Sequence, residues 1–287
     1  MPFDHIVVVM MENHSFDNVL GALSRSGQAA ADGLSFDGSP PNGTIFDRLD
    51  AHGISWHDYF TDLPGTVVIP AIIGKHLTHL RTIGKFYEDC AAGTLPGVSF
   101  VDPEAGLLAY AGTLLAKLPV LGTIGAKLET HGGDEEDPQD MRHGEVWAHR
   151  VVEAVLGSPA WPRTLLVYTY DEHGGYYDHV PPADAIAPDS IPPKLSSTDV
   201  PGGYDIYGPR VPAVVASPYS KPNAATNVVH DHTSVLATIE AKWNLPALTY
   251  RDANAATVMD FLDPDEASLL TPPTIQGPSD TGPPAPA

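Results

Sequence analysis

The chain has 287 residues, enough for one large α/β domain or two small ones, and 43% of them are hydrophobic, enough for a substantial core. Acidic residues outnumber basic ones by 36 to 15, which gives a formal net charge of −21. Because such a surface repels nucleic acids and anionic membranes, and no Lys/Arg stripe compensates for it, we expect no nucleic-acid partner.

The expected elements alternate along the chain. A continuous apolar run at His5–Met11 predicts a strand at the centre of a parallel sheet. Short helical spacing follows over Phe46–Ala51, and a longer helix is expected over Gly144–Leu156, where Gly-Ser-Pro ends it. A second apolar run, Thr164–Tyr170, predicts another buried strand. A third buried strand is expected over Val211–Ala216, with Pro212 placing the start of the ladder at an edge or at the first residues.

Asp231 or Thr233 is expected to cap a final helix that runs from Val235 to Trp243. Strands that alternate with helices predict an α/β fold, a three-layer sandwich with a mainly parallel sheet covered on both faces. The segment Pro181–Gly203 contains six prolines and is expected to form a long loop over the functional site. Residues 1–270 are expected to form one domain, and residues 271–287 a disordered Pro-rich tail.

Polar side chains follow the first two strands at the point where each strand ends. Glu12 and Asn13 follow the first strand, and Asp171, Glu172 and His173 follow the second. Ligands of open α/β sheets bind at the carboxyl ends of strands. Carboxylate and carboxamide oxygens suit Mg²⁺, Ca²⁺ or Mn²⁺, while imidazole shifts the preference toward Mn, Fe or Zn. We therefore expect one divalent metal ion between these strand ends, since without a cation the carboxylates would repel one another. Capping of a following helix is the alternative role for Asn13 and Asp171.

Other polar residues nearby have simpler interpretations. Ser15 and Asp17 are expected to cap the helix after the first strand. His179 and His230 fit either a functional site or an ordinary surface position. His232 lies in the sequence His-Asp-His-Thr-Ser, between an acid and two hydroxyls, which favours a functional role.

The remaining features concern compartment and redox state. The single cysteine, Cys90, cannot form an internal disulfide, and we interpret it as a small buried core residue rather than a nucleophile. No run of roughly eighteen apolar residues occurs, so stable membrane anchoring is not expected. No basic segment or cleavage site precedes the first strand. We therefore expect a cytoplasmic protein as the sequence is written, or a secreted one if a leader was removed.

A set of ordered segments extends, with gaps, from about residue 5 to residue 256. It opens with HIVVVMMENHSFDNVLG and continues with TIFDRLDAHGISWHDYFTDLP and FYEDCAAGTLPGVSFVDPE. A signature segment, WPRTLLVYTYDEHGGYYDHVPP, follows, and YGPRVPAVVASPY and HDHTSVLATIEAKWNLPALTYRDA complete the set. Together they resemble the bacterial phospholipase C and acid phosphatase family of phosphoesterases, which has an alkaline-phosphatase-like fold.

This resemblance implies a metal-dependent hydrolase of phosphate esters. The implied ligands of one divalent ion (Ca, Mg, Mn, Fe or Zn) are Glu12, Asn13, Asp171 and Glu172. His173 and His232 would lie beside the phosphate and aid the leaving group or the phosphoryl oxygens. The implied chemistry is attack on phosphorus, with the metal stabilising charge on the oxygens. The implied substrates are small phosphate mono- or diesters, including phospholipid head groups.

The sequence departs from the family pattern in two places. Family members carry a Pro-rich, Asn-Arg-containing segment with a Ser or Thr nucleophile between the opening motif and TIFDRL, whereas here the loop Gly33–Gly43 joins the two directly. The family commonly has His-Pro-Pro where this chain has Asp137 followed by Pro-Gln. Either Asp137 substitutes as an oxygen ligand, or the contact is lost.

Without the usual segment, the nearby hydroxyls of Ser15, Ser39 and Thr44 have no recognisable nucleophile context. We therefore expect hydrolysis by direct attack of water, at a low rate. Two alternatives stay open. One is a degenerate family member that binds metal or phosphate with little or no catalysis, and the other is a metal-dependent hydrolase of a different ester.

Overall fold

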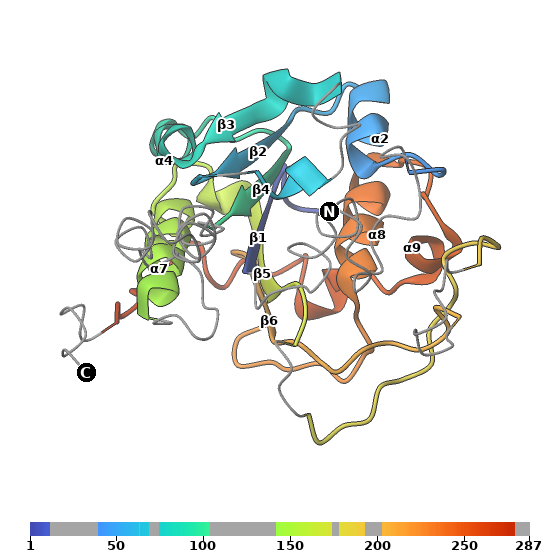
Figure 1. The fold of residues 1–287 in the computed structure, drawn as a ribbon. Helices are drawn as coiled ribbons and strands as arrows, with labels where there is room; N and C mark the ends of the chain where they lie inside the picture. The colour runs from blue at the N-terminus through green and yellow to red at the C-terminus, as the bar shows by residue number, and fades with distance from the viewer. Residues whose placement is uncertain are drawn as a thin grey trace, which may run out of the picture.

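The computed structural model describes residues 1–11, 40–62, 64–68, 75–103, 142–173, 178–192 and 203–278. The strands of its sheet are β1 (His5–Met11), β2 (Trp56–Phe60), β3 (Leu80–Thr82), β4 (Val98–Asp102), β5 (Thr164–Tyr170) and β6 (Ala213–Ala216). They form one six-stranded sheet in the order β3-β2-β4-β1-β5-β6 (Figure 1). Every neighbouring pair is parallel except β5 and β6, so the expected mainly parallel sheet is confirmed.

The two expected central strands occur with the predicted bounds. β1 and β5 pair in parallel along their whole length, from His5 opposite Thr164 to Met11 opposite Tyr170. Their side chains alternate between two apolar layers because successive residues of a strand point to opposite faces. In β1, for example, Ile6 lies in one layer and Val7 in the other.

The third expected strand is shorter and more exposed than predicted. β6 begins at Ala213, directly after Pro212, and pairs antiparallel with β5. β6 lies at the edge of the sheet and Pro212 directly precedes its first residue, so both places expected for the proline agree with the structure. The prediction of a buried strand is wrong, since Val214 is 59% exposed.

Helices cover both faces of the sheet, as expected for an α/β fold (Figure 1). On one face, α2 (Ile45–Ala51) and α8 (His232–Trp243) pack through residues such as Leu49 and Ile239. On the other face, α4 (Ile83–Ala92) and α7 (Arg142–Leu156) pack through residues such as Phe86 and Val151. A short helix, α9 (Tyr250–Asn254), lies beside α8.

Two local predictions are confirmed by these helices. Asp231 is the N-cap of α8: its side chain accepts a hydrogen bond from the Thr233 N–H, and Ser234 accepts one in return from the Asp231 N–H. This reciprocal arrangement is a capping box. Cys90 on α4 is 1% exposed, and burial raises the pKa of its thiol to about 12. A thiol that is buried and protonated is a core residue rather than a nucleophile.

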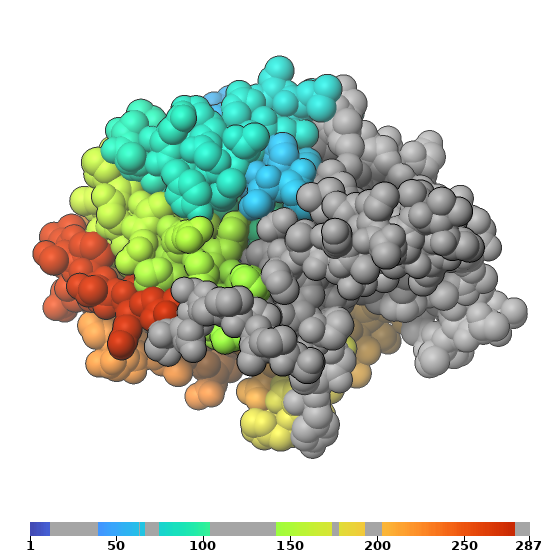
Figure 2. Space-filling model, turned by 60° about the vertical axis from the view of Figure 1, so that its left-hand side comes forward, coloured from blue at the N-terminus to red at the C-terminus, as the bar shows by residue number. Residues whose placement is uncertain are grey.

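The last described segment of the chain, which includes Leu269 and Ile275, lies beside α7. Figure 2 shows this segment, in red, against the yellow-green surface that contains α7. The Trp161 indole donates a hydrogen bond to the Leu269 carbonyl at 2.9 Å, and Ile275 packs against the apolar layer of α7. Residues 279–287 lie outside the described residues, so the expected division into a domain and a disordered tail stays a prediction. Among the described residues, no helix is long and apolar enough to span a bilayer.

A buried pair of carboxyl groups joins α8 to α9. Glu240 and Asp252 are 6% and 2% exposed. Burial, together with the neighbouring Asp252, raises the pKa of Glu240 to about 8. Burial also acts to raise the pKa of Asp252, but hydrogen bonds from Thr249, Glu240 and two backbone N–H groups outweigh it and lower that pKa. Near neutral pH, therefore, Glu240 keeps a proton that it donates to the Asp252 carboxylate.

This pair predicts a specific dependence of stability on pH. Between about pH 4.5 and about pH 8, the folded chain holds a proton on Glu240 that the unfolded chain has released. Because the folded state then binds more protons, the free energy of unfolding decreases as pH rises through this interval. We expect Glu240→Gln to remove a slope of at most about 1.4 kcal/mol per pH unit. Urea unfolding at several pH values measures it.

The matched control is Glu266→Gln, which changes an exposed glutamate. It should keep the wild-type slope. If the slope were the same in wild type and in both variants, Glu240 would be ionised in the folded protein and the shared proton would not exist.

Candidate functional site

The carboxyl ends of β1 and β5, which precede the two halves of the expected site, lie side by side. The N–H of Asp171 donates a hydrogen bond to the Met11 carbonyl at 3.1 Å. The pairing of the two strands therefore continues one residue beyond the end of β5. Glu12 follows Met11 in the sequence, and its place beside Asp171 stays a prediction. Glu12 and Asn13 themselves lie outside the described residues.

Glu172 has one oxygen with a partner and one without. Its Oε2 accepts a hydrogen bond from His173 Nδ1 at 3.0 Å, whereas Oε1 is buried and has no hydrogen-bond partner within the described part of the chain. A buried carboxylate oxygen without a partner is unfavourable, and a neighbouring cation compensates for it. The Glu172 N–H also donates to Asp171 Oδ1 at 2.7 Å, which holds the two acids close together. These oxygens fit a divalent metal ion.

The contact with Glu172 also orients His173. A carboxylate can only accept a hydrogen bond, so Nδ1 of the neutral His173 ring carries the hydrogen. A carboxylate on one ring nitrogen is a common way to fix the orientation of an imidazole beside a metal site. The other ring nitrogen, Nε2, is therefore the one with a lone pair.

His232 comes from a distant part of the sequence to the same place. It is the first residue of α8, and its Nε2 lies 2.7 Å from the Tyr170 carbonyl at the end of β5. A carbonyl can only accept, so Nε2 carries the hydrogen and Nδ1 is the remaining nitrogen. The structure thus brings His232 next to the residue that precedes Asp171. The roles of His173 and His232 in catalysis stay predictions.

The two histidines with open interpretations lie elsewhere. The side chain of His179 is 81% exposed and pairs only loosely with Asp178, at 3.5 Å. His230 contacts Asp260 at 3.0 Å, which ties the loop before α8 to the 3₁₀ helix Val258–Phe261. The contacts of His179 are those of a surface histidine. The contact of His230 is that of a structural ion pair.

A strong ion pair fastens the loop that follows Asp171 and Glu172. Arg210 donates to both oxygens of Asp178, from Nε at 2.6 Å and from Nη2 at 2.8 Å. The Arg210 guanidinium holds the pKa of the Asp178 carboxyl well below its usual range. This two-point contact is the planar geometry that arginine provides and lysine does not. It connects the segment after β5 to the residues just before β6.

A second pair of acids at this edge of the sheet was not predicted from the sequence. Asp102 is the last residue of β4, and Asp58 lies on the neighbouring β2 with 0% exposure. Burial raises the pKa of Asp58, against the hydrogen bonds from Asp102 and Thr66 that lower it. The Thr66 hydroxyl donates to Asp58 at 2.5 Å, and the Gly65 N–H donates to Asp102. One signal was available: Phe-Val-Asp at the end of β4 repeats the pattern of an acid that ends a buried strand.

The hydroxyl of Thr44 has a structural role. Thr44 is 7% exposed and is the N-cap of α2, where its Oγ1 accepts from the Asp47 N–H and donates to Asp47 Oδ2. A hydroxyl with both roles filled by a helix cap is not placed as a nucleophile. The other residues considered in this context, Ser15, Asp17, Ser39 and Asp137, lie outside the described residues.

Acids and histidines that meet at the carboxyl edge of a mainly parallel sheet place this chain among α/β proteins with a metal-type site at that edge. The chain belongs to the phosphoesterase family, whose model matches residues 36–246. It is 32% identical to non-specific phospholipase C6 of Arabidopsis thaliana over 248 residues, which cover 82% of this chain and 43% of that protein. Non-specific phospholipase C1 of the same plant is 31% identical, over 76% of this chain and 39% of its own length.

A bacterial relative is also similar. Phospholipase C A of Mycobacterium tuberculosis is 33% identical over 173 residues, which cover 57% of this chain and 28% of that protein. The chain therefore spans less than half the length of the curated relatives named here. The family expected from the ordered segments is confirmed.

Glu172 Oε1, which has no partner among the described residues, leads us to a prediction about metal binding that can be tested without an activity assay. We expect Ca²⁺, Mg²⁺ or Mn²⁺ to stabilise the wild-type protein, by about 2.7 kcal/mol when the free ion is at 100 times its dissociation constant. Glu172→Gln should lose most of this effect, because the amide carries no charge for the ion. Without metal, the variant should lose little stability, since the neutral amide replaces a carboxylate whose Oε1 has no partner among the described residues. Thermal unfolding with chelator and with each ion measures both effects.

Glu266→Gln is again the matched control, and it should respond to metal as the wild type does. An equal metal response in Glu172→Gln and in wild type would exclude Glu172 as a ligand.

Proposed function

We propose that this chain hydrolyses phosphate esters at the carboxyl edge of its sheet, and that its architecture is of the alkaline-phosphatase-like kind. The observation that carries the proposal is the hydrogen bond between the Asp171 N–H and the Met11 carbonyl. It aligns the end of β5 with the last residue of β1, which supports a site to which Glu12 and Asn13 contribute together with Asp171 and Glu172. Membership of the phosphoesterase family supports the same site and chemistry.

The ligands of the metal ion in this proposal are Glu12, Asn13, Asp171 and Glu172. When bound, a divalent ion supplies positive charge that stabilises the oxygens of a phosphoryl group during attack at phosphorus. The protein contributes the position of these oxygens. Glu172 would hold the ion with Oε1 while its Oε2 accepts from His173, and the Asp171 N–H is bonded to the Met11 carbonyl of β1.

We assign the two histidines to the phosphate. Each has one ring nitrogen engaged by the protein, Nδ1 of His173 by Glu172 and Nε2 of His232 by the Tyr170 carbonyl. The other nitrogen of each ring is the atom that would meet a phosphoryl or leaving oxygen. When protonated, it donates a hydrogen bond that stabilises developing charge or passes a proton to the leaving group.

The substrates in this proposal are small phosphate mono- or diesters. The relatives named above carry the name phospholipase C, which supports phospholipid head groups as one source of the ester. The net charge of −21 opposes tight adsorption to anionic membranes, so we propose that the head group is recognised through the metal and local contacts rather than through a basic surface.

A second candidate function is binding without turnover. The sequence lacks the Ser/Thr segment that family members usually carry, and positioning of a nucleophile contributes several kcal/mol to catalysis. A degenerate relative would keep the metal or phosphate site and lose this contribution. The same assay separates the two candidates.

We expect the purified protein to hydrolyse p-nitrophenyl phosphate or bis(p-nitrophenyl) phosphate, and a chelator to abolish the reaction until Ca²⁺, Mg²⁺ or Mn²⁺ is restored. His232→Ala should lower kcat/KM by about 100-fold to 10,000-fold, the usual effect of removing a positioned acid or base. His52→Ala, at an exposed position after α2, is the control and should keep the wild-type rate. Metal binding without any turnover would instead support the second candidate.

The missing segment also predicts the stereochemistry at phosphorus. If water attacks directly in one step, configuration inverts, whereas a covalent intermediate retains it through two inversions. We expect inversion with an isotopically chiral phosphate ester, and we expect Thr66→Val to keep the stereochemical outcome. Retention of configuration would contradict direct attack, and phosphate trapped on a hydroxyl would identify the nucleophile.

A further inference from the structure

A second cluster of metal-type ligands lies at the opposite edge of the sheet from Asp171. Asp50 is in the last turn of α2, shortly before β2 begins, and His76 and His79 come just before β3 begins. Because β2 and β3 run in the same direction as β5, the starts of these strands face away from the end of β5. A seven-residue strand such as β5 spans roughly 20 Å. The cluster is therefore separate from the site described above.

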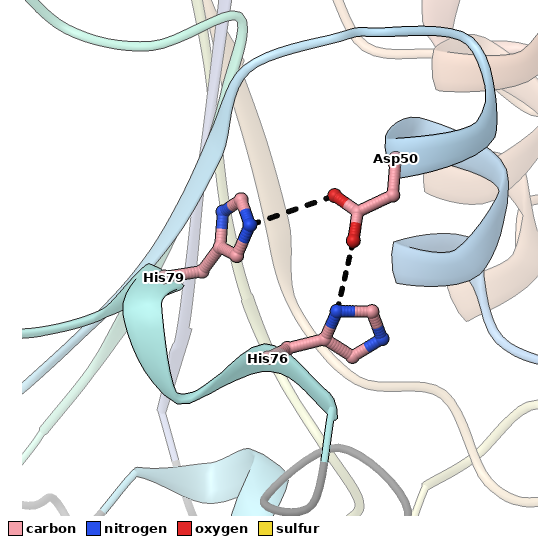
Figure 3. Close-up of side chains that lie close together, drawn as sticks. All are labelled: Asp50, His76 and His79. Carbon is pink, nitrogen blue, oxygen red and sulfur yellow. Dashed lines mark ion pairs between the residues drawn. The ribbon is translucent and has the colours of Figure 1, made fainter.

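The three side chains point toward one another (Figure 3). His76 Nδ1 lies 2.9 Å from one Asp50 oxygen, and His79 Nε2 lies 3.6 Å from the other. One ligand atom from each residue can be chosen so that all lie within 4.8 Å of one another. Two ligands of a tetrahedral zinc ion, each about 2.0–2.1 Å from the metal, are about 3.3 Å apart. The two observed separations, one to each Asp50 oxygen, lie on either side of this spacing.

The hydrogen bonding of His79 leaves a position for a cation. Its Nδ1 lies 2.9 Å from the Trp56 carbonyl, and a carbonyl can only accept. The hydrogen of the neutral ring is therefore on Nδ1, and the lone pair of Nε2 faces Asp50 Oδ1. Two acceptors that face each other repel, and a cation between them removes the repulsion. A carbonyl on the second ring nitrogen is also the usual partner of a metal-bound histidine.

His76 is in a similar situation and is more deeply buried, at 5% exposure. Both of its ring nitrogens face carboxylates, Nδ1 that of Asp50 and Nε2 that of Asp47 at 3.5 Å. A neutral imidazole has one N–H and satisfies only one of the two. Asp47 has other donors, Lys75 and Thr44. Asp50 is therefore the carboxylate that a metal ion would share with His76.

One indole holds all three residues in place. Trp56 stacks on His79 with 4.2 Å between ring centroids and 4° between planes, and its edge-to-face contact with His76 is 5.5 Å between centroids. Its Nε1–H donates to Asp50 Oδ1 at 2.8 Å. Trp56 itself is fully buried in the core, so the ligands are positioned before any ion arrives.

We propose that Asp50, His76 and His79 bind a zinc ion, or a related divalent transition metal, at a site distinct from the phosphoesterase site. Two imidazoles and one carboxylate suit zinc far better than Ca²⁺ or Mg²⁺, which prefer an all-oxygen shell. Three protein ligands leave a fourth position for water. The ion fastens the end of α2 to the segment that leads into β3, a strand of three residues at the edge of the sheet.

The test uses the whole chain and removes the other site first. In an Asp171→Ala background, isothermal titration with Zn²⁺ should give one site per chain, and excess Mg²⁺ should not compete for it. Zn²⁺ should raise the melting temperature by roughly 5 °C when it is well above its dissociation constant. Adding His79→Gln should remove both effects, whereas adding His52→Gln, an exposed histidine after α2, should remove neither. Glutamine is chosen because its amide still donates to the Trp56 carbonyl.

Folding and the proposed function are controlled separately. Circular dichroism of each metal-free variant checks its fold, and if His79→Gln does not fold, Asp50→Asn takes its place, because asparagine still accepts from the Trp56 indole. His79→Gln in the otherwise wild-type chain should keep any phosphoesterase activity, so loss of the zinc site and loss of the proposed function are distinguishable. Equal zinc binding with and without the cluster variants would overturn the proposal. Absence of zinc binding in the Asp171→Ala protein would also overturn it, and the cluster would then be an ion-pair network only.

Discussion

The parallel register of β1 and β5 is the constraint on which the described site depends. Because His5 lies opposite Thr164 and Met11 opposite Tyr170, the two strands end at the same level. The residue after β5 therefore lies next to the end of β1, where the Asp171 N–H donates to the Met11 carbonyl. A shift of the register by one residue would break this contact and turn the side chains of one strand to the opposite face of the sheet. The apolar layers on both faces of β1 and β5 prevent such a shift, so the core sets the geometry of the site.

The two acids of this site are held close together. The Glu172 N–H donates to the Asp171 carboxylate, and one Glu172 oxygen accepts from His173. The other Glu172 oxygen has no hydrogen-bond partner among the described residues. On the far side of β1, Asp58 and Asp102 accept hydrogen bonds from Thr66 and Gly65, and burial raises the pKa of Asp58. The two acid pairs thus differ in the donors that the described residues supply to them.

The elements that the sequence predicted well are those with uninterrupted apolar runs or clear helical spacing. β1 and β5 were predicted with correct bounds, and α7 and α8 with correct ends at Leu156 and Trp243. β2 and β4 were not predicted, because buried Asp58 and Ser99 interrupt their apolar pattern. These polar residues are buried for local hydrogen bonding, which a periodicity does not reveal. For the same reason, the acids at Asp58 and Asp102 and the cluster around Asp50 were missed: each depends on contacts between residues far apart in the sequence.

The capping box of α8 has a consequence for how sharply His232 is held. As the first residue of the helix, His232 has its backbone fixed by the reciprocal hydrogen bonds between Asp231 and Ser234, and its ring is tethered to the Tyr170 carbonyl. Most of its conformational freedom is therefore already lost when the chain folds, and little remains to be lost when a ligand binds. A histidine on a mobile loop would lose this conformational entropy each time a ligand binds. At the helix terminus, His232 loses it once, when the chain folds.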